Sequence, residues 1–129
     1  MSGKKILIVD DEPHIFLALQ LEFEHSYSLF KAENITEAIE QARSIQPDLI
    51  ILDIMMPENT ASAGHIDPIA GIKVYNALKN DKLTSLIPVI FLSVKKDSID
   101  LKGLRPEPYK KIGKPFNIDE LVKAVNDLF

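Results

Sequence analysis

Three short, continuous apolar runs divide the chain, at residues 6–9 (ILIV), 49–52 (LIIL) and 89–92 (VIFL). Runs that are this short, rich in β-branched residues and not alternating are typical of parallel strands buried on both faces. Two weaker candidates lie at 27–30 (YSLF) and near 109–113 (YKKIG). The hydrophobic pattern therefore predicts five strands.

Between the strands, apolar residues recur at helical spacing. Segment 35–45 places its apolar side chains on one helical face, which comprises Ile35, Ala38, Ile39, Ala42 and Ile45. Asn34 before this segment and Glu37 three residues later predict a cap in which each side chain bonds to the backbone of the other. The final segment, 118–128, repeats the design with Asn117 and Glu120 as the expected cap.

Helices are also expected over 13–24 and 71–80, and a weaker helical pattern covers 98–104. Strands and helices then alternate, which favours an α/β fold with helices on both faces of a parallel sheet. We expect a flavodoxin-like, doubly wound (βα)5 fold over residues 1–129 as one domain. Its strand order would be 2-1-3-4-5, with a ligand crevice at the carboxyl ends of strands 1 and 3.

Composition removes several classes of function. The chain has 129 residues and a net charge of −4, which argues against direct nucleic-acid binding because phosphate contacts need a basic face. It has no cysteine, which excludes disulfides, thiolate metal sites and cysteine nucleophiles. No segment approaches the roughly 20 apolar residues of a membrane span. We expect a cytoplasmic protein without membrane insertion.

Acidic residues follow two strands that should be neighbours. Asp10 and Asp11 end the first strand and Asp53 ends the third. At about 4 Å and an effective dielectric near 20, each like-charged pair costs on the order of 4 kcal/mol. A cation among the three carboxylates would offset this cost, and a hard ion such as Mg²⁺ suits oxygen ligands.

Two further polar residues should lie on the same rim: Ser93 after the fourth strand and Lys114 after the fifth. Pro115 biases Lys114 toward an extended backbone. A metal ion, a hydroxyl and an ammonium group together can hold the oxygens of a phosphoryl group. Since no other nucleophile is evident, Asp53 is the candidate acceptor, forming an acyl phosphate.

Over nearly its whole length the sequence resembles a response-regulator receiver domain of two-component signalling (CheY-like). The matching motifs are VDDE (9–12), LDIMMP (52–57), Ser93 after the fourth strand, and KPF (114–116). The resemblance implies that Asp53 takes a phosphoryl group from a phosphohistidine on a sensor histidine kinase or a histidine phosphotransfer protein. It also implies a signalling switch rather than a metabolic enzyme, although the domain assists its own phosphorylation and hydrolysis.

The resemblance assigns roles to the other site residues. Asp11 and Asp53 would ligate Mg²⁺ directly, the backbone carbonyl of Met55 would be a third ligand, and Asp10 would act through water. Lys114 would pair with Asp53 and then with the phosphoryl oxygens. Ser93 would turn toward the phosphate and shift a face that a downstream protein or effector domain reads. That face comprises residues 98–104, 109–113 and 118–128, and a homodimer through it is a further assembly to consider.

Besides Val94, which follows Ser93 where a small residue is usual, two larger features depart from the family pattern. Thirteen residues separate Pro57 from Gly71, well beyond ordinary loop lengths, so 58–70 is interpreted as an inserted loop. It would be a lid, a docking surface that uses His65 and Asp67, or a surface insertion without a role. The last is favoured because added loop length costs little entropy.

The second departure lies three residues before Lys114, where receivers usually carry an aromatic residue and this chain has Lys111. Tyr109, two residues earlier and expected on the same face of the strand, is the candidate substitute. This departure concerns the signalling readout rather than the acceptor chemistry.

Other interpretations stay open. Asp11 or Glu12 alone would be an ordinary helix cap, which leaves Asp53, Ser93 and Lys114 unexplained. A receiver-like binding module without phosphotransfer is one alternative, although all five site residues are present. A Mg²⁺-dependent phosphohydrolase with an aspartate nucleophile is another, but such enzymes typically carry a second acid where this chain has Met55. Whether the chain acts alone or belongs to a longer protein is not decided by its sequence.

Overall fold

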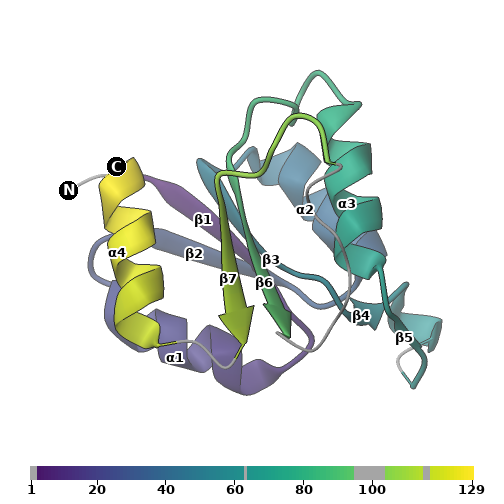
Figure 1. Ribbon diagram of the computed structural model, residues 1–129, viewed down its shortest axis with the longest axis horizontal. Coiled ribbons are helices and arrows are strands. Elements are labelled where there is room, and N and C mark those ends of the chain that lie inside the picture. The colour runs from purple at the N-terminus through teal and green to yellow at the C-terminus, as the bar shows by residue number, and fades with distance from the viewer. Residues whose placement is uncertain (1–2, 63, 95–103, 115–116) are drawn as a thin grey trace.

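A five-stranded parallel sheet forms the centre of the computed structural model, which describes residues 3–62, 64–94, 104–114 and 117–129 (Figure 1). Its strands are β1 (Lys5–Val9), β2 (Ser28–Ala32), β3 (Leu49–Asp53), β6 (Val89–Val94) and β7 (Lys110–Lys114). They lie in the order β2-β1-β3-β6-β7, and every pair is parallel. The expected doubly wound, flavodoxin-like fold with strand order 2-1-3-4-5 is confirmed.

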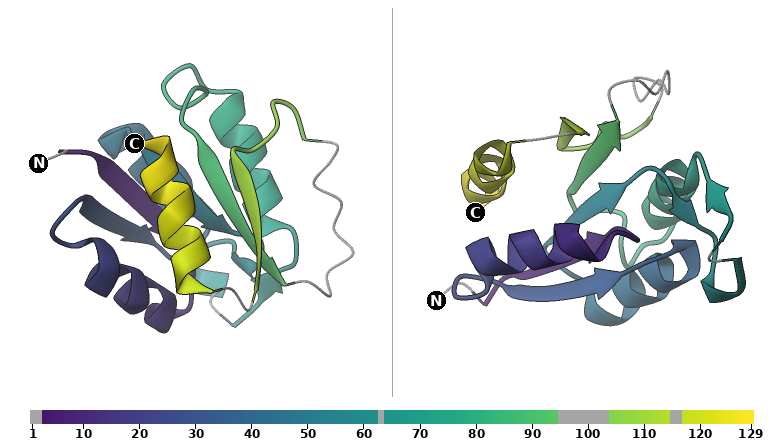
Figure 2. Two further views of the ribbon diagram at one scale, coloured as in Figure 1. Left: turned by 60° about the vertical axis from the view of Figure 1, so that its left-hand side comes forward. Right: turned by 90° about the horizontal axis from the view of Figure 1, so that it is seen from below.

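Helices cover both faces of this sheet. They are α1 (Pro13–Phe23), α2 (Ile35–Ile45), α3 (Ala70–Lys79) and α4 (Ile118–Leu128). Figure 2 shows α1 and α4 on one side of the sheet and α2 and α3 on the other. The helix expected over 98–104 lies outside the described residues, apart from the buried Leu104. No described helix is both long and apolar enough to cross a lipid bilayer.

The core has two halves because successive side chains of a strand point to opposite faces. Ile6 and Ile8 of β1 pack with residues of α1 and α4, whereas Leu7 and Val9 pack with residues of α2 and α3. All five residues of β3 are buried. Each fully buried leucine or isoleucine contributes roughly 1.5–3 kcal/mol. The continuous apolar runs are therefore explained by burial on both faces.

The two predicted helix caps differ in outcome. At α2, the Asn34 side chain accepts the Glu37 N–H at 2.8 Å, as expected. The Glu37 carboxylate accepts from the side-chain amide of Asn34 at 3.0 Å and from the backbone N–H of Glu33 at 3.1 Å, instead of the expected backbone N–H of Asn34. At α4, the Asn117 side chain accepts from Asp119 at 2.8 Å and not from Glu120. An N-cap side chain can reach either of these two amides, so spacing alone did not decide between them.

The connection from β3 to α3 contains structure that the hydrophobic pattern did not predict. The strands β4 (Met56–Pro57) and β5 (Ile66–Asp67) pair antiparallel, with a 3-10 turn, η1 (Thr60–Ser62), between them. Two-residue strands, one of them containing proline, carry no readable periodicity. In Figure 1 this hairpin lies beside the first turn of α3.

Candidate functional site

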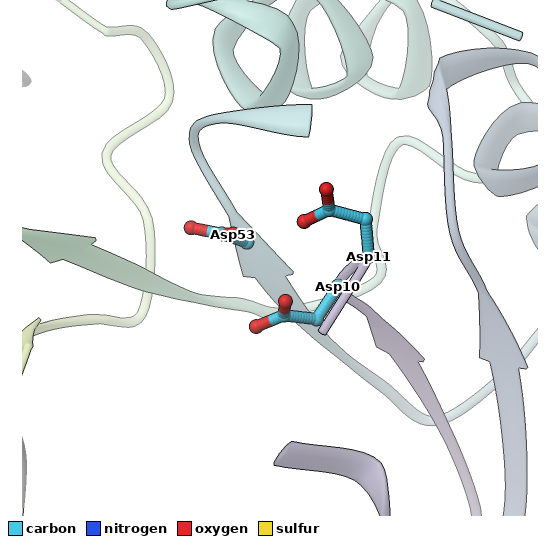
Figure 3. Close-up of side chains that lie close together, drawn as sticks. All are labelled: Asp10, Asp11 and Asp53. Carbon is cyan, nitrogen blue, oxygen red and sulfur yellow. The ribbon is translucent and has the colours of Figure 1, made fainter. Parts of the chain in front are cut away.

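Three aspartates gather where β1 and β3 end. Val9 pairs with Leu52 in the sheet, so Asp10 and Asp53 are the next residues along two neighbouring strands. Together with Asp11, each offers a carboxylate oxygen, and the three oxygens lie within 4.8 Å of one another. Figure 3 shows the three carboxylates at the ends of these strands. The structure therefore brings together the acidic residues that the sequence analysis singled out.

The site is only partly open to water. Asp10 and Asp53 are each 6% exposed, and Asp11 is half-buried. Repulsion among three such carboxylates amounts to several kcal/mol if all are ionised and about 4 Å apart. The donors are all hard oxygen ligands, which match the preference of Mg²⁺ and would not suit a soft metal ion. The residues present therefore fit the ion that the sequence analysis expected.

Local hydrogen bonds orient two of these carboxylates. Asp10 Oδ1 accepts the Glu12 N–H at 2.9 Å, and Asp53 Oδ1 accepts the N–H of Ile54 at 2.8 Å. Glu12 immediately precedes α1, but its side chain makes no capping bond. For Glu12, the alternative of a helix-capping side chain is therefore wrong. The carboxylate that accepts the amide at this helix start belongs to Asp10, a member of the acidic cluster.

Gly71 packs closely against the backbone of Asp53 and Ile54 at the end of β3. Its N–H donates to the Ile54 carbonyl at 2.7 Å. A methyl group on Gly71 would lie 2.3 Å from the carbonyl oxygen of Asp53 and 2.7 Å from Cα of Ile54, closer than real contacts allow. From the sequence, Gly71 was expected to begin a helix and to mark the end of the inserted loop. A glycine in a helix costs about 1 kcal/mol relative to alanine, and this cost is the signal that marks the position.

Of the other predicted site residues, Met55 is described in full, whereas only the backbones of Ser93 and Lys114 are described. Met55 is half-buried and follows Asp53 in the bend after β3. Ser93 pairs with Gly113, and Val94 with Lys114, at the carboxyl ends of β6 and β7. Both ends lie at the same edge of the sheet as Asp53, which pairs with Leu92. The side chains of Ser93 and Lys114 lie outside the described part of the chain.

The expectation that Tyr109 lies on the same strand face as Lys111 is wrong. Tyr109 precedes β7, packs against the half of the core that α1 and α4 cover, and donates its hydroxyl to the Ala124 carbonyl at 3.2 Å. Lys111 is exposed, and its strand neighbour Ile112 points into that same half of the core. Since adjacent strand residues face opposite ways, Tyr109 and Lys111 do not share a face. The hydrogen bond to Ala124 holds the Tyr109 side chain against α4, on the face of the sheet opposite to Lys111.

The two residues considered for docking in the 58–70 segment also differ from each other. His65 is exposed. Asp67 forms an ion pair with Lys73 and accepts the Ile69 N–H at 2.9 Å. The hydrogen bond from Lys73 is the main reason that the pKa of Asp67 lies below its usual value. Asp67 is therefore already engaged in holding the start of α3.

Comparisons with known proteins agree with this geometry. A family model described as the response regulator receiver domain matches residues 6–126. The chain is 35% identical over 128 residues to the alkaline phosphatase synthesis transcriptional regulatory protein PhoP of Bacillus subtilis, covering 95% of this chain and 48% of PhoP. It is 32% identical over 124 residues to protein PilH of Pseudomonas aeruginosa, covering 95% of this chain and 94% of PilH.

Solved structures give the same result. The receiver domain of the Francisella response regulator 1452 aligns with a TM-score of 0.77 and 29% identity, covering 97% of this chain and 95% of that one. The chain therefore belongs to the response-regulator receiver family, whose members are signalling modules rather than metabolic enzymes. It spans about half the length of PhoP and nearly all of PilH. Receivers of this family interact with histidine kinases and downstream effectors, and bind Mg²⁺ at an acidic pocket.

Proposed function

We propose that this chain is a phosphoacceptor switch that takes a phosphoryl group onto Asp53 from a phosphohistidine on a sensor kinase or phosphotransfer protein. The observation that carries the proposal is the acidic cluster on two neighbouring strands, in a chain of the receiver family. A carboxylate oxygen of Asp53 forms a bond to phosphorus while the bond from phosphorus to the imidazole nitrogen breaks. The imidazole leaves with a proton, and Asp53 becomes an acyl phosphate.

The surrounding residues have distinct roles in this proposal. Asp11, Asp53 and the backbone carbonyl of Met55 would hold Mg²⁺ directly and Asp10 would act through water; the ion would neutralise charge on the carboxylates and the phosphoryl oxygens. The ammonium of Lys114 and the hydroxyl of Ser93 bind the phosphoryl oxygens. Hydrolysis of the acyl phosphate by water returns the switch to its resting state.

The output follows from the position of these groups. Ser93 is the last residue but one of β6, and Lys114 is the last residue of β7. Binding of the phosphoryl group would therefore bias the face formed by β7 and α4, together with the helix expected over 98–104, between two states. A downstream protein or effector domain, or a second copy of the chain, reads that face. In this proposal residues 1–129 act as one receiver domain, and 58–70 is an insertion within it.

Incubation with acetyl phosphate and Mg²⁺, followed by intact-protein mass spectrometry, tests the proposal. The wild-type chain should gain the mass of one phosphate, and the Asp53→Asn variant should gain none. Asp127→Asn, a carboxyl-to-amide change on the exposed end of α4, should leave the gain unchanged. Absence of any gain, or a gain that survives Asp53→Asn, would favour a binding module without phosphotransfer.

A further inference from the structure

The 58–70 segment is tied to the rest of the molecule beside the acidic cluster. The N–H and the hydroxyl of Thr36, in the first turn of α2, both donate to the Glu58 carbonyl, at 3.0 and 3.2 Å. Asn59 and Ser62 bond to each other across η1 through side chains and backbone. Asp67 holds the other end through its contacts with α3. The described residues of the segment, 58–62 and 64–70, are therefore held in place by hydrogen bonds near both ends, and they are called the wall below.

This wall presents two apolar side chains to solvent. Ile66 is 45% exposed and Ile69 is 42% exposed. Ile66 pairs with Pro57 across the β4–β5 hairpin, and Pro57 is the residue immediately before the 58–70 segment. Ile69 is two residues before Gly71, so its Cα lies within about 7.6 Å of the glycine that contacts the Asp53 backbone. Ile69 is thus close along the chain to the glycine that packs against Asp53, and Ile66 lies opposite Pro57, a residue that lines the groove described next.

A polar groove of about 270 Å³ lies on the same wall. Its lining comprises Asp11, Glu33, Asn34, Glu37, Pro57, Asn59 and Thr60. It therefore joins the acidic cluster to the start of α2 and to the 58–70 segment. Three of its residues are acidic, and Lys31, 3.4 Å from Glu33, offsets only part of their charge. A surface that covers this region would match it with basic side chains in the groove and apolar side chains over the isoleucines.

We propose that Ile66, Ile69 and the groove form the docking surface for the protein phosphodonor, a protein that carries a phosphohistidine beside basic and apolar side chains. The inference rests on the function proposed above. Asp53 is 6% exposed, so a protein donor must cover the rim of the site to bring phosphorus within reach of the carboxylate. A small acyl phosphate need not touch the wall. The 58–70 segment would therefore select among protein donors.

The test compares two donors on the same variants. The protein donor is the phosphorylated histidine phosphotransfer domain that transfers fastest to the wild-type chain within a panel of such domains, and the small donor is acetyl phosphate. Ile66→Ser combined with Ile69→Ser should slow transfer from the protein donor about tenfold. The rate from acetyl phosphate should stay within about twofold of wild type, because the isoleucines do not contact the acceptor carboxylate.

Matched controls separate docking from general damage. Leu83→Ser removes a side chain of similar exposure, 48%, in the connection that enters β6 at the opposite end of the sheet. It should change neither rate. Ile66→Ser alone keeps the test valid if the change at Ile69, the residue before α3, weakens the helix. That single variant should lose part of the protein-donor rate at an unchanged unfolding midpoint.

Each other outcome has a definite meaning. Wild-type transfer to the double variant from the protein donor would overturn the docking surface and leave the proposed function intact. An equal loss with both donors would also overturn it, because the segment would then act on the site itself. Failure of wild-type chain to accept phosphate from acetyl phosphate and Mg²⁺ would instead remove the proposed function, and the docking surface with it.

Discussion

Two connections leave neighbouring strands at the same edge of the sheet, and they differ greatly in length. Residues 10–12 join β1 to α1, whereas residues 54–69 join β3 to α3 and contain a hairpin. Both end in the same local bond, in which an aspartate accepts the N–H two residues later at 2.9 Å. The donors are Glu12 for Asp10 and Ile69 for Asp67. The start of each helix is therefore fixed in the same way.

The two connections differ in whether the aspartate that holds the helix, Asp10 or Asp67, also belongs to the acidic cluster. Asp10 belongs to the acidic cluster, so in the short connection one residue serves both the helix and the site. In the long connection these tasks are divided, because Asp67 holds α3 and Gly71 contacts the backbone of Asp53. The geometry of the site therefore depends on a few close contacts and not on the number of residues between them.

The contact at Gly71, in the first turn of α3 just after the long connection, should be the most sensitive point of this region. Gly71→Ala forces a methyl group against the backbone of Asp53 and Ile54, which should lower the free energy of unfolding by about 3 kcal/mol and slow phosphorylation by acetyl phosphate. Urea unfolding and mass spectrometry measure the two effects. Gly64→Ala, in the long connection itself and with no atom within 4 Å of the added methyl, should change the stability by less than about 0.5 kcal/mol.

The short connection should show its role through the metal ion. If Mg²⁺ binds with a dissociation constant of about 1 mM, about 10 mM Mg²⁺ should raise the free energy of unfolding of the wild-type chain by about 1.4 kcal/mol. Asp11→Asn should lose most of this gain, and without metal it should be no less stable than wild type because one like charge is removed. Thermal unfolding with and without Mg²⁺ gives both values.

The adjacent Glu12→Gln is the matched control for that experiment. Glu12 is exposed, and its side chain makes no capping bond, so the variant should keep the full stabilisation by Mg²⁺. Equal stabilisation of Asp11→Asn and wild type would show that the acidic cluster is not the metal site.

The smallest effect should come from the ion pair between Asp67 and Lys73, at the end of the long connection. The pKa of Asp67 is lowered, mainly by its hydrogen bond with Lys73. This contribution is therefore fully present above the ordinary carboxyl pKa near 4 and is lost as pH falls through the lower pKa of the folded state. Asp67→Asn keeps an acceptor for the Ile69 N–H but loses the charge.

Urea unfolding at about pH 5 and about pH 2.5 checks this prediction. At the higher pH, wild type should be more stable than Asp67→Asn. This difference in the free energy of unfolding should shrink at the lower pH. Lys73→Met should lower the stability at the higher pH to a similar extent. A difference that is independent of pH would contradict the assignment of the lowered pKa to this ion pair.

The main elements of the fold were predictable because their cause is local in sequence. The run at 49–52 is continuous because β3 is buried on both sides, and Asn34 lies before α2 because its side chain accepts an amide of the first turn. Strand order then placed Asp10 and Asp53 at one edge. Sequence patterns thus sufficed for the acidic cluster, in which Asp53 ends β3 and Asp10 and Asp11 are the first two residues after β1.

What the sequence could not provide depends on contacts between distant segments. Thr36 bonds to Glu58, and Tyr109 bonds to Ala124; neither partner is indicated by any spacing along the chain. The same is true of Gly71, whose need for a missing side chain comes from the backbone of Asp53. The hairpin of β4 and β5 has too few residues for periodicity, so its pairing is decided by the ends of the connection.

That closed hairpin has a consequence for how the protein can diversify. Since the pairing of β4 with β5 brings the two ends of this connection together, the residues between them, apart from Glu58 with its bonds to α2, can change in length or composition without displacing β3 or α3. New partner preferences can therefore be acquired by small steps at these residues, each compatible with a folded and working intermediate.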